Sequence, residues 1–364
     1  MIKYIGSKRV LVDPIVEVVQ SFPEVRSVVD FFSGTSRVGH ALKRAGFQVK
    51  ANDWMAYGHT LAQCYVQADA GDVLAPAQSI IDELMSLEGI DGYVTETFCR
   101  QSRFFQPKNG MRIDAIREEI ERLSENGLTP ELRAVLLVSL MEASDRVDST
   151  TGVQMAYLKK WAPRSFKDLE MRLPDILPAA THGPCSASQY EAQEAAKNLT
   201  ADLAYIDPPY NQHSYLGNYH VWESLVTWDK PEVYGVACKR VDCRERKSDF
   251  NSKRKFQEAF DSFINSLQCK FLVVSFNNEG YIQRPEMEKL LRSRGDVYTV
   301  VRDHKRYVGA QIGIYNPSGD VVGEVSHLRN KEFLYVVVPE GYEWSADQYH
   351  SQTTENDPLL FSES

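Results

Sequence analysis

The tetrapeptide Asp207-Pro208-Pro209-Tyr210 constrains this chain more than any other feature. It follows the apolar run Leu203–Ile206, which predicts a buried β-strand. A carboxylate, two rigid residues and an aromatic ring therefore leave the carboxyl end of a core strand, where open α/β sheets bind ligands. An ionised aspartate and the proline carbonyls can only accept hydrogen bonds. The loop suits a flat heterocycle that carries an amino group; the alternative is a surface turn that only ends the strand.

A second segment has the order strand, glycine turn, helix. An apolar run at residues 27–32 is followed by a turn that contains Gly34, and a helical pattern begins at Val38. Gly34 lets the backbone turn tightly and approach a ligand, and the helix N-terminus offers free amide donors. About 20 residues on, a second predicted strand (residues 48–53) ends in Asp53, where dinucleotide folds place an acid for ribose hydroxyls. The segment predicts nucleoside binding, although Asp53 could instead cap a helix.

The N-terminal residues 3–9 combine an aromatic ring, a glycine and several cations. They lack the apolar core that a signal peptide needs. Tyr4 could stack on another ring and Lys8 could pair with a carboxylate. The alternative is a frayed basic tail.

Composition limits the class of protein. The 364 residues allow one large or two ordinary domains, and 43% hydrophobic residues support a packed core. No apolar run approaches the length of a membrane span, so we expect no membrane partner. The six cysteines are scattered without a CxxC pair or a matching histidine cluster, so we expect reduced thiols, a cytoplasmic location and no metal site.

The charge is unevenly distributed. The net charge is −9, but residues 340–364 contribute six carboxylates and no Lys or Arg, which leaves −3 for the rest. Residues 239–255 instead hold eight cations against three carboxylates. Such a local basic stripe is what phosphate contact requires, whereas a solvated charged loop is the alternative. A smaller cluster from Lys159 to Lys167 combines cations with Trp161. The eight cations are Lys239, Arg240, Arg244, Arg246, Lys247, Lys253, Arg254 and Lys255.

The pattern along the chain predicts two structural parts and a tail. Residues 1–64 and 181–340 have α/β character, and residues 65–180 predict a mainly helical insertion. Within the insertion we expect helices at 113–123 and from Pro130 through Ala143, with a loop at 104–110. Residues 341–364 predict an acidic flexible tail. Later strand candidates are 203–210, 271–276, 297–302 and 333–338, and the last two could form an antiparallel hairpin.

In this order, the segments resemble the alpha-group, Dam-like adenine-specific DNA methyltransferases of restriction–modification systems. Tyr4 to Lys8 match the family's aromatic-x-Gly-x-Lys start, and Phe32-Ser33-Gly34 match its Phe-x-Gly loop. Asp53 matches the acid that ends the second strand. The Asp-Pro-Pro-Tyr loop follows a target-recognition insertion, as it does in the family. Thr151–Lys159, Tyr215–His220 and Phe276–Gly280 are also similar to family segments, so the likeness covers most of residues 1–340.

The resemblance implies a Rossmann-like, S-adenosylmethionine-dependent methyltransferase sheet, mostly parallel with an antiparallel last strand. It implies methyl transfer from S-adenosylmethionine to the 6-amino group of an adenine flipped out of double-stranded DNA. Asp207 and the Pro208 carbonyl would accept the two amine hydrogens, and Tyr210 would stack on the base. For the cofactor, Tyr4 and Lys8 would hold the methionine part, Phe32 and Gly34 would shape the loop, Asp53 would bind the ribose, and Asp207 would lie beside it.

Two positions depart from the family pattern. Ser36 stands where a glycine is usual, which would tighten the cofactor loop, and no acid precedes Glu191 to hold the cofactor adenine. Tyr215 and His220 fit either the base pocket or the core. Asn211 and Glu279 are expected to be structural.

Several functional alternatives remain open from sequence. The same chemistry could act on cytosine or on RNA. A non-catalytic nucleic-acid-binding protein is disfavoured because Asp207 and Tyr210 are intact, and a nicotinamide oxidoreductase because Gly-x-Gly-x-x-Gly is missing. We expect a monomer, which a cognate restriction endonuclease could accompany.

Overall fold

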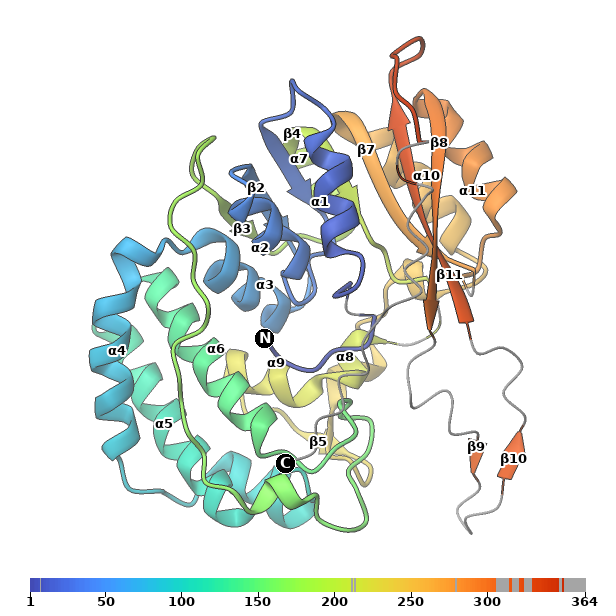
Figure 1. Ribbon diagram of the computed structural model, residues 1–364. Coiled ribbons are helices and arrows are strands. Elements are labelled where there is room, and N and C mark those ends of the chain that lie inside the picture. Colours follow the sequence, from blue (N-terminus) through green and yellow to red (C-terminus); the bar gives the residue numbers. More distant parts are fainter. Residues whose placement is uncertain are drawn as a thin grey trace.

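A seven-stranded sheet forms the centre of the computed structural model, with strand order β3-β2-β1-β4-β7-β11-β8 (Figure 1). The structure describes residues 1–6, 8–210, 212, 214–278, 280–305, 314–315, 321–323, 329–346 and 349. Asn211, Glu279 and most of the predicted tail lie outside these residues. The strands of this sheet are β1 (Ser27–Asp30), β2 (Gln48–Asn52), β3 (Ser186–Ser188), β4 (Thr200–Ile206), β7 (Gln268–Asn277), β8 (Asp296–Lys305) and β11 (Arg329–Val338).

The sheet is parallel except at its last strand in sequence. β1 pairs in parallel with β2 and β4, and β4 pairs in parallel with β7. β11 lies between β7 and β8 and runs antiparallel to both, with Phe333 opposite Phe276 and Val301. The predicted sheet class and the predicted antiparallel pairing of the last two strand candidates are confirmed. Strand order reverses between β1 and β4, which is the crevice where such sheets bind ligands.

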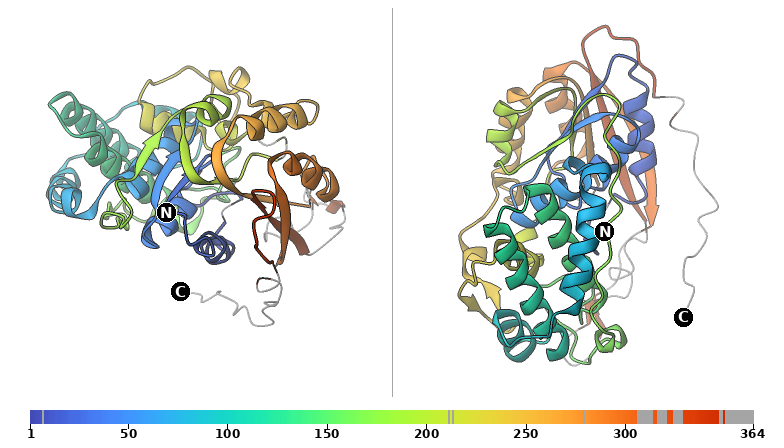
Figure 2. Two further views of the ribbon diagram at one scale, coloured as in Figure 1. Left: turned by 90° about the horizontal axis from the view of Figure 1, so that it is seen from above. Right: turned by 90° about the vertical axis from the view of Figure 1, so that its left-hand side faces the viewer.

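Helices cover both faces of the sheet, because strands in a parallel sheet are apolar on both sides (Figure 2). Val28 of β1 packs with Leu42 on one face, and Val29 packs with Phe263 on the other. The first face carries α1 (Val12–Gln20) and α2 (Arg37–Arg44); the second carries α7 (Ala192–Asn198), α10 (Phe256–Ser266) and α11 (Arg284–Leu291).

A helical lobe lies below and to the left of the sheet in Figure 1. Its core combines side chains of the predicted insertion, such as Ile116 and Leu136, with Leu216 and Trp222, which follow the Asp-Pro-Pro-Tyr loop. The lobe is therefore built from two separate stretches of sequence. Its helices are α4 (Ala70–Ser86), α5 (Pro107–Glu125), α6 (Pro130–Arg146), α8 (Tyr215–Asn218) and α9 (His220–Thr227), and α3 (Ala56–Ala62) joins it to the sheet.

Short elements complete the described chain. Two π-helical turns, η1 (Gln63–Gln67) and η2 (Thr95–Gln101), extend α3 and precede α5. The remaining elements are β5 (Val233–Tyr234), β6 (Lys239–Arg240), β9 (Ile314–Tyr315), β10 (Val321–Gly323), η3 (Pro163–Phe166), η4 (Val241–Arg244), η5 (Asp249–Asn251) and η6 (Arg292–Arg294). None of the described helices is long and apolar enough to cross a membrane.

The expected loop at residues 104–110 is wrong for its second half. α5 begins at Pro107, which occupies the first turn, where its missing amide hydrogen costs nothing. Gly110 lies inside this helix because α5 packs closely on η2: a β-carbon at Gly110 would overlap the Cys99 sulfur and lie 3.2 Å from Thr95 Cα. Glycine here permits close packing and does not mark a turn.

Gly110→Ala is expected to destabilise the lobe. Overpacking of this kind costs about 1–3 kcal/mol, because the η2 backbone has to shift. Gly71→Ala is the matched control, since Gly71 is also helical and a β-carbon there meets no atom within 4 Å. It should not destabilise the chain and should stabilise it by less than about 1 kcal/mol, because Gly71 lies in the first turn of α4. Urea denaturation followed by circular dichroism measures both changes; equal stabilities of the two variants would contradict the packing argument.

Candidate active site

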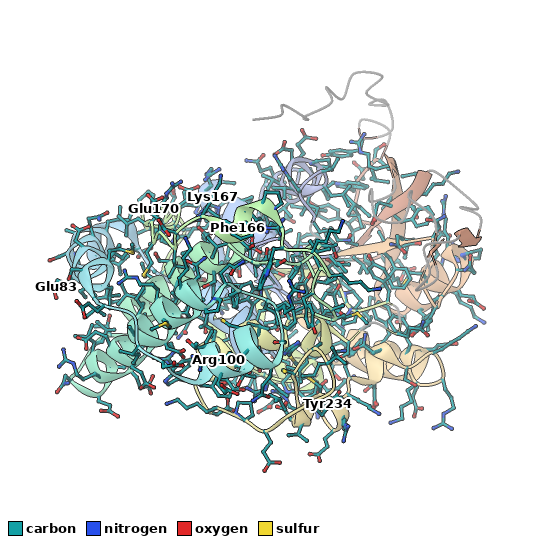
Figure 3. The ribbon with its side chains drawn as sticks, turned by 90° about the horizontal axis from the view of Figure 1, so that it is seen from below. Glu83, Arg100, Phe166, Lys167, Glu170 and Tyr234 are labelled. Atoms are coloured by element: carbon teal, nitrogen blue, oxygen red, sulfur yellow. The ribbon has the colours of Figure 1, made fainter. Side chains whose placement is uncertain are left out.

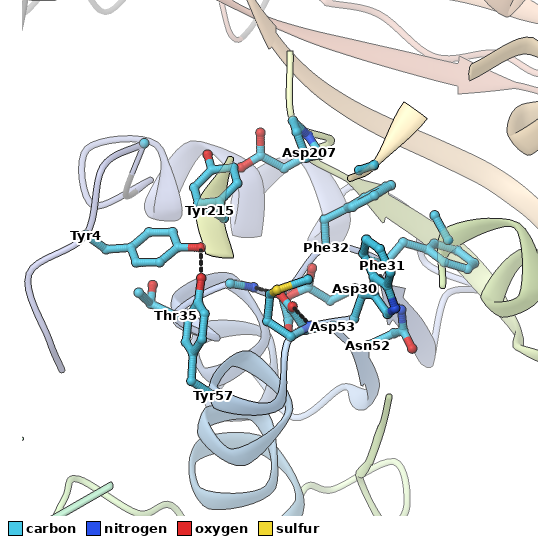
Figure 4. A pocket seen from close by; sticks show the side chains of 18 of the residues that line it. Tyr4, Asp30, Phe31, Phe32, Thr35, Asn52, Asp53, Tyr57, Asp207 and Tyr215 are labelled. Carbon is cyan, nitrogen blue, oxygen red and sulfur yellow. Dashed lines mark hydrogen bonds between the residues drawn. The ribbon is translucent and has the colours of Figure 1, made fainter. Parts of the chain in front are cut away.

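Three aspartates gather where the strand order reverses. Asp30 ends β1, Asp53 follows β2 and Asp207 follows β4, and parallel strands place these carboxyl ends at one edge of the sheet. A cavity opens beside them (Figure 4). All six residues expected at the cofactor line this cavity: Tyr4, Lys8, Phe32, Gly34, Asp53 and Asp207.

The glycine loop has two residues in the left-handed region of backbone space. Gly34 has φ 51° and Ser36 has φ 58°. A β-carbon at Gly34 would make an ordinary van der Waals contact with the Tyr4 ring at 3.4 Å, so it is the backbone conformation, and not a lack of space, that favours glycine here. Ser36 replaces the usual glycine but keeps a conformation that glycine adopts most easily.

Asp53 ties the second strand to the glycine loop. Its Oδ2 accepts a hydrogen bond from the Gly34 amide (2.8 Å) and its Oδ1 accepts one from the Met55 amide (2.8 Å). Burial raises the pKa of Asp53 to about 7, although the two amides lower it. Asp53 thus has a partner near the start of α3 and also faces the cavity.

Gly58 of α3 makes room for this carboxyl group. A β-carbon there would lie 2.7 Å from Asp53 Oδ1 and 2.8 Å from Oδ2, closer than real β-carbons approach such atoms. The sequence gives no local reason for this glycine, which lies inside a helix.

The N-terminal segment is held by aromatic contacts and does not behave as a frayed tail. The Tyr4 ring is stacked with Tyr219 at 4.5 Å and with Tyr215 at 5.3 Å, measured between ring centroids. The Tyr4 and Tyr57 hydroxyls are 3.1 Å apart (Figure 4). The Ile5 amide also donates to the Tyr219 hydroxyl at 2.6 Å. Tyr215 lines the cavity, so it belongs to the site.

The buried side chain of Lys8 forms an ion pair with the Asp-Pro-Pro-Tyr loop. Its Nζ lies 3.2 Å from Asp207 Oδ1 and 3.5 Å from Glu332 Oε2, and its side chain is 7% exposed. Burial alone would lower the pKa of Lys8, but the two carboxylates outweigh burial and raise that pKa well above its usual range. Burial raises the pKa of Asp207 to about 6, although Lys8 lowers it. Lys8 is therefore charged, and Asp207 is mostly ionised at neutral pH.

Tyr210 of the Asp-Pro-Pro-Tyr loop is held by contacts with Phe276 and Tyr281. The Tyr210 ring packs edge-on against Phe276 at 5.4 Å, and the Tyr281 amide donates to the Tyr210 carbonyl at 3.2 Å. Pro209 lines the cavity, whereas Pro208 is buried beside it. The roles expected for the Pro208 carbonyl and the Tyr210 ring stay predictions.

Two further acidic groups near the cavity were not expected from sequence. Burial, then Asp207 and Asp53, raise the pKa of Asp30 to about 8, while the Gly39 and Phe32 amides lower it. The acid at the end of the first strand was a signal that could have indicated Asp30. The second group is Glu223, which is buried on α9.

Glu223 connects α3 to the basic segment. It accepts hydrogen bonds from the Tyr57 amide at 3.0 Å and from Arg246 at 3.0 Å. The Arg246 guanidinium also lies over the Trp54 ring, 5.4 Å from its centroid. Both Arg246 and Trp54 line the cavity.

The basic stripe at 239–255 is only partly available at the surface. Arg240 is buried and pairs with Asp229 at 2.7 Å and Asp242 at 3.1 Å, so it is a structural cation. Lys255 pairs with Asp249 at 2.9 Å. Lys247, Lys253 and Arg254 are exposed and make no ion pair with a described residue. The number of cations in the sequence overstates the usable charge.

His220 belongs to the core and not to the pocket. It is fully buried in the lobe, and its Nε2 lies 2.9 Å from the Gln154 carbonyl. Burial lowers its pKa to about 4, so the imidazole is neutral. The core alternative for His220 is the one the structure supports.

Several known proteins have sequences similar to this one. The chain is 30% identical over 309 residues to Type II methyltransferase M.FokI of Planomicrobium okeanokoites, covering 80% of this chain and 47% of that protein. It is 30% identical over 315 residues to Type II methyltransferase M.CviAII of Paramecium bursaria Chlorella virus 1, covering 84% and 92%. With Type II methyltransferase M.NlaIII of Neisseria lactamica it shares 28% over 309 residues, covering 84% and 90%. The chain therefore spans about half the length of M.FokI and most of the other two.

A family model described as D12 class N6 adenine-specific DNA methyltransferase matches residues 4–289. That range contains the N-terminal segment, the glycine loop, the helical lobe and the Asp-Pro-Pro-Tyr loop. The chain belongs to the D12 class of N6 adenine-specific DNA methyltransferases.

Proposed function

We propose that this chain transfers a methyl group from S-adenosylmethionine to the 6-amino group of an adenine in duplex DNA. The observation that carries the proposal is the position of Asp207. Its carboxylate lies at the crevice between β1 and β4, paired with Lys8, and lines the same cavity as the glycine loop and Asp53. An acceptor for an amine and a nucleoside site therefore share one space.

The cavity has the groups that S-adenosylmethionine needs. Asp53 offers carboxylate oxygens to ribose hydroxyls, and Phe32 and Trp54 provide ring surfaces. The Ser33 hydroxyl is buried without a hydrogen-bond partner among the described residues, so it can accept a ligand donor. Lys8 borders the end nearest Asp207, and Tyr4 borders the glycine loop. When bound, S-adenosylmethionine supplies a methyl group that its sulfonium centre has already activated.

The chain's own residues then have to activate and position the amine. The lone pair of an aromatic amine is delocalised into its ring, so the nitrogen is a weak nucleophile. A hydrogen bond accepted by Asp207, and a second accepted by the Pro208 carbonyl, favour a pyramidal nitrogen with a usable lone pair. Tyr210 would stack on the base. Because the amine is out of reach inside a duplex, the adenine has to leave the stack.

The helical lobe is the part proposed to recognise DNA. We assign this role to residues 65–180, together with α8 and α9, which share their core. The proposed phosphate contacts are Lys247, Lys253 and Arg254, because Arg246 of the same segment lines the cavity. On the lobe, Phe166 and Lys167 are exposed next to each other (Figure 3).

A separate restriction endonuclease, a monomeric state and a cytoplasmic location remain proposals.

Asp207→Asn tests the proposed reaction. Wild type is incubated with S-adenosylmethionine and with separate pools of duplex DNA and RNA, and the nucleosides are identified by mass spectrometry. We expect N6-methyladenine from duplex DNA. Asp207→Asn should reduce the rate by on the order of a thousandfold, because a neutral amide oxygen accepts a hydrogen bond less strongly than a carboxylate does. Cofactor affinity should change only a few-fold. N4-methylcytosine or methylated RNA would redirect the proposal, and near-normal turnover by the variant would refute the mechanism.

Gly58→Ala tests the role of Asp53. The added methyl group has to displace the carboxyl group, so cofactor affinity measured by calorimetry should fall at least about tenfold, equivalent to about 1.4 kcal/mol. Gly71→Ala, on α4 and in open space, should leave the affinity unchanged. Unaltered binding in Gly58→Ala would mean that Asp53 does not contact the cofactor.

The double variant Lys253→Ala/Arg254→Ala tests the DNA surface. If each cation contacts one phosphate, the plot of log affinity against log salt should become shallower by about two. The loss should be similar for specific and random duplexes, because phosphate contacts carry no sequence information. Lys289→Ala on α11 is the control and should have no effect. An unchanged salt slope in the double variant would place the DNA elsewhere.

A further inference from the structure

Glu332 of β11 carries a carboxylate whose Oε2 atom is buried and which the mechanism above does not use. It lies in register with Asn277 of β7 and Arg302 of β8, at the end of the sheet that carries the catalytic loop. Its side chain is 12% exposed, and its Oε2 lies 3.5 Å from Lys8 Nζ. Lys8 therefore has one carboxylate on either side, Asp207 and Glu332.

A second carboxylate beside this buried ammonium group costs folding free energy, which indicates that Glu332 has a function. Removing a carboxylate from water carries a large penalty, and an apolar residue at a buried ion-pair position is often no worse for stability. Glu332 does not line the cavity, so it is not placed to touch a cofactor or a base. What it does touch is the ammonium group that faces Asp207.

We propose that Glu332 is a positioning residue for methyl transfer: it holds the Lys8 ammonium beside Asp207 and offsets part of its charge. A cation paired with Asp207 alone would draw electron density from the oxygen that has to accept the amine hydrogen. With two carboxylates on one ammonium, Asp207 stays a stronger acceptor. The proposal rests on the proposed function, because it assigns Glu332 a part in that same reaction.

The charges around Asp207 determine whether a substitution raises or lowers the pKa of its carboxyl group. Lys8 on the N-terminal segment lowers the pKa of Asp207, whereas Glu332 on β11 raises it. Asp30 on β1, Tyr205 on β4 and Tyr215 on α8 also face this carboxyl group. Since the acceptor has to be ionised, the wild-type rate should fall as the pH drops through about 6, the pKa of Asp207.

Glu332→Gln and Lys8→Gln should shift the acidic limb of the pH–rate profile, which is the fall in rate near pH 6, in opposite directions. The single-turnover rate of methyl transfer is measured against pH with saturating S-adenosylmethionine. Glu332→Gln removes a negative charge and should shift the limb to lower pH by about one unit; Lys8→Gln should shift it upward by a similar amount. The plateau rate should also fall in Glu332→Gln. Glu332→Asp keeps the charge and should restore the limb to within a few tenths of a pH unit of wild type.

Carbon-13 NMR of the Asp207 carboxyl group gives a readout that does not depend on turnover. The protein is labelled at aspartate, and the Asp207 signal is assigned with Asp207→Asn. The titration midpoint should be lower in Glu332→Gln and higher in Lys8→Gln. If Glu332→Gln does not fold, Lys8→Gln still tests the link through which Glu332 acts, because the Asp207 midpoint has to rise in that variant.

The possible failures are distinguishable. A limb and a midpoint that do not move in Glu332→Gln, or that move upward, would overturn the role of Glu332 while leaving methyl transfer intact. An unmoved midpoint in Lys8→Gln would overturn it as well. Absence of a methylated base with wild type on every duplex would instead refute the proposed function, and the carbon-13 titration would still test the electrostatic coupling.

Discussion

The buried ion pair between Lys8 and Asp207 is the interaction on which the rest of the site depends. It joins the N-terminal segment to the loop after β4 across 3.2 Å. Without Lys8, Asp207 would be a carboxylate beside Tyr205 and Tyr215, and burial would favour its neutral form. Removing one partner of a buried pair typically costs about 3–5 kcal/mol, because the other charge is left uncompensated. The Lys8–Asp207 pair thus holds the N-terminal segment in place and favours the ionised form of Asp207, the proposed hydrogen-bond acceptor.

The N-terminal segment also connects the catalytic loop to the helical lobe. Lys3 donates to the Asp145 carbonyl of α6 at 2.6 Å, and the Ile5 amide donates to Tyr219 at the start of α9. Tyr4 lies between these contacts, against the glycine loop. A short stretch of chain therefore touches the lobe, the cavity and Asp207 in turn. If the lobe reads DNA as proposed, its position and the position of the catalytic carboxylate are mechanically linked through this segment.

Local sequence patterns and the family resemblance together predicted the sheet and six residues that line the cavity. Gly34, Asp53 and Asp207 could be assigned because each follows a segment predicted to be a strand, and parallel strands bring their ends together. Residues that matter through distant contacts could not be found this way. Gly58 is needed only because Asp53 folds against it, and Glu332 becomes significant only when β11 inserts beside β7. Arg240 shows the opposite error, since a surface cation in the sequence pattern proves to be a buried ion-pair partner.

A structure of the chain with duplex DNA and a non-reactive cofactor analogue would test most directly whether Asp207 accepts a hydrogen bond from the target amine. The prediction is an adenine outside the duplex, with its 6-amino nitrogen about 3 Å from the Asp207 carboxylate and Lys8 still paired behind it. A target base whose amine lies out of reach of Asp207, or a Lys8 ammonium that has turned away to another partner, would contradict this arrangement.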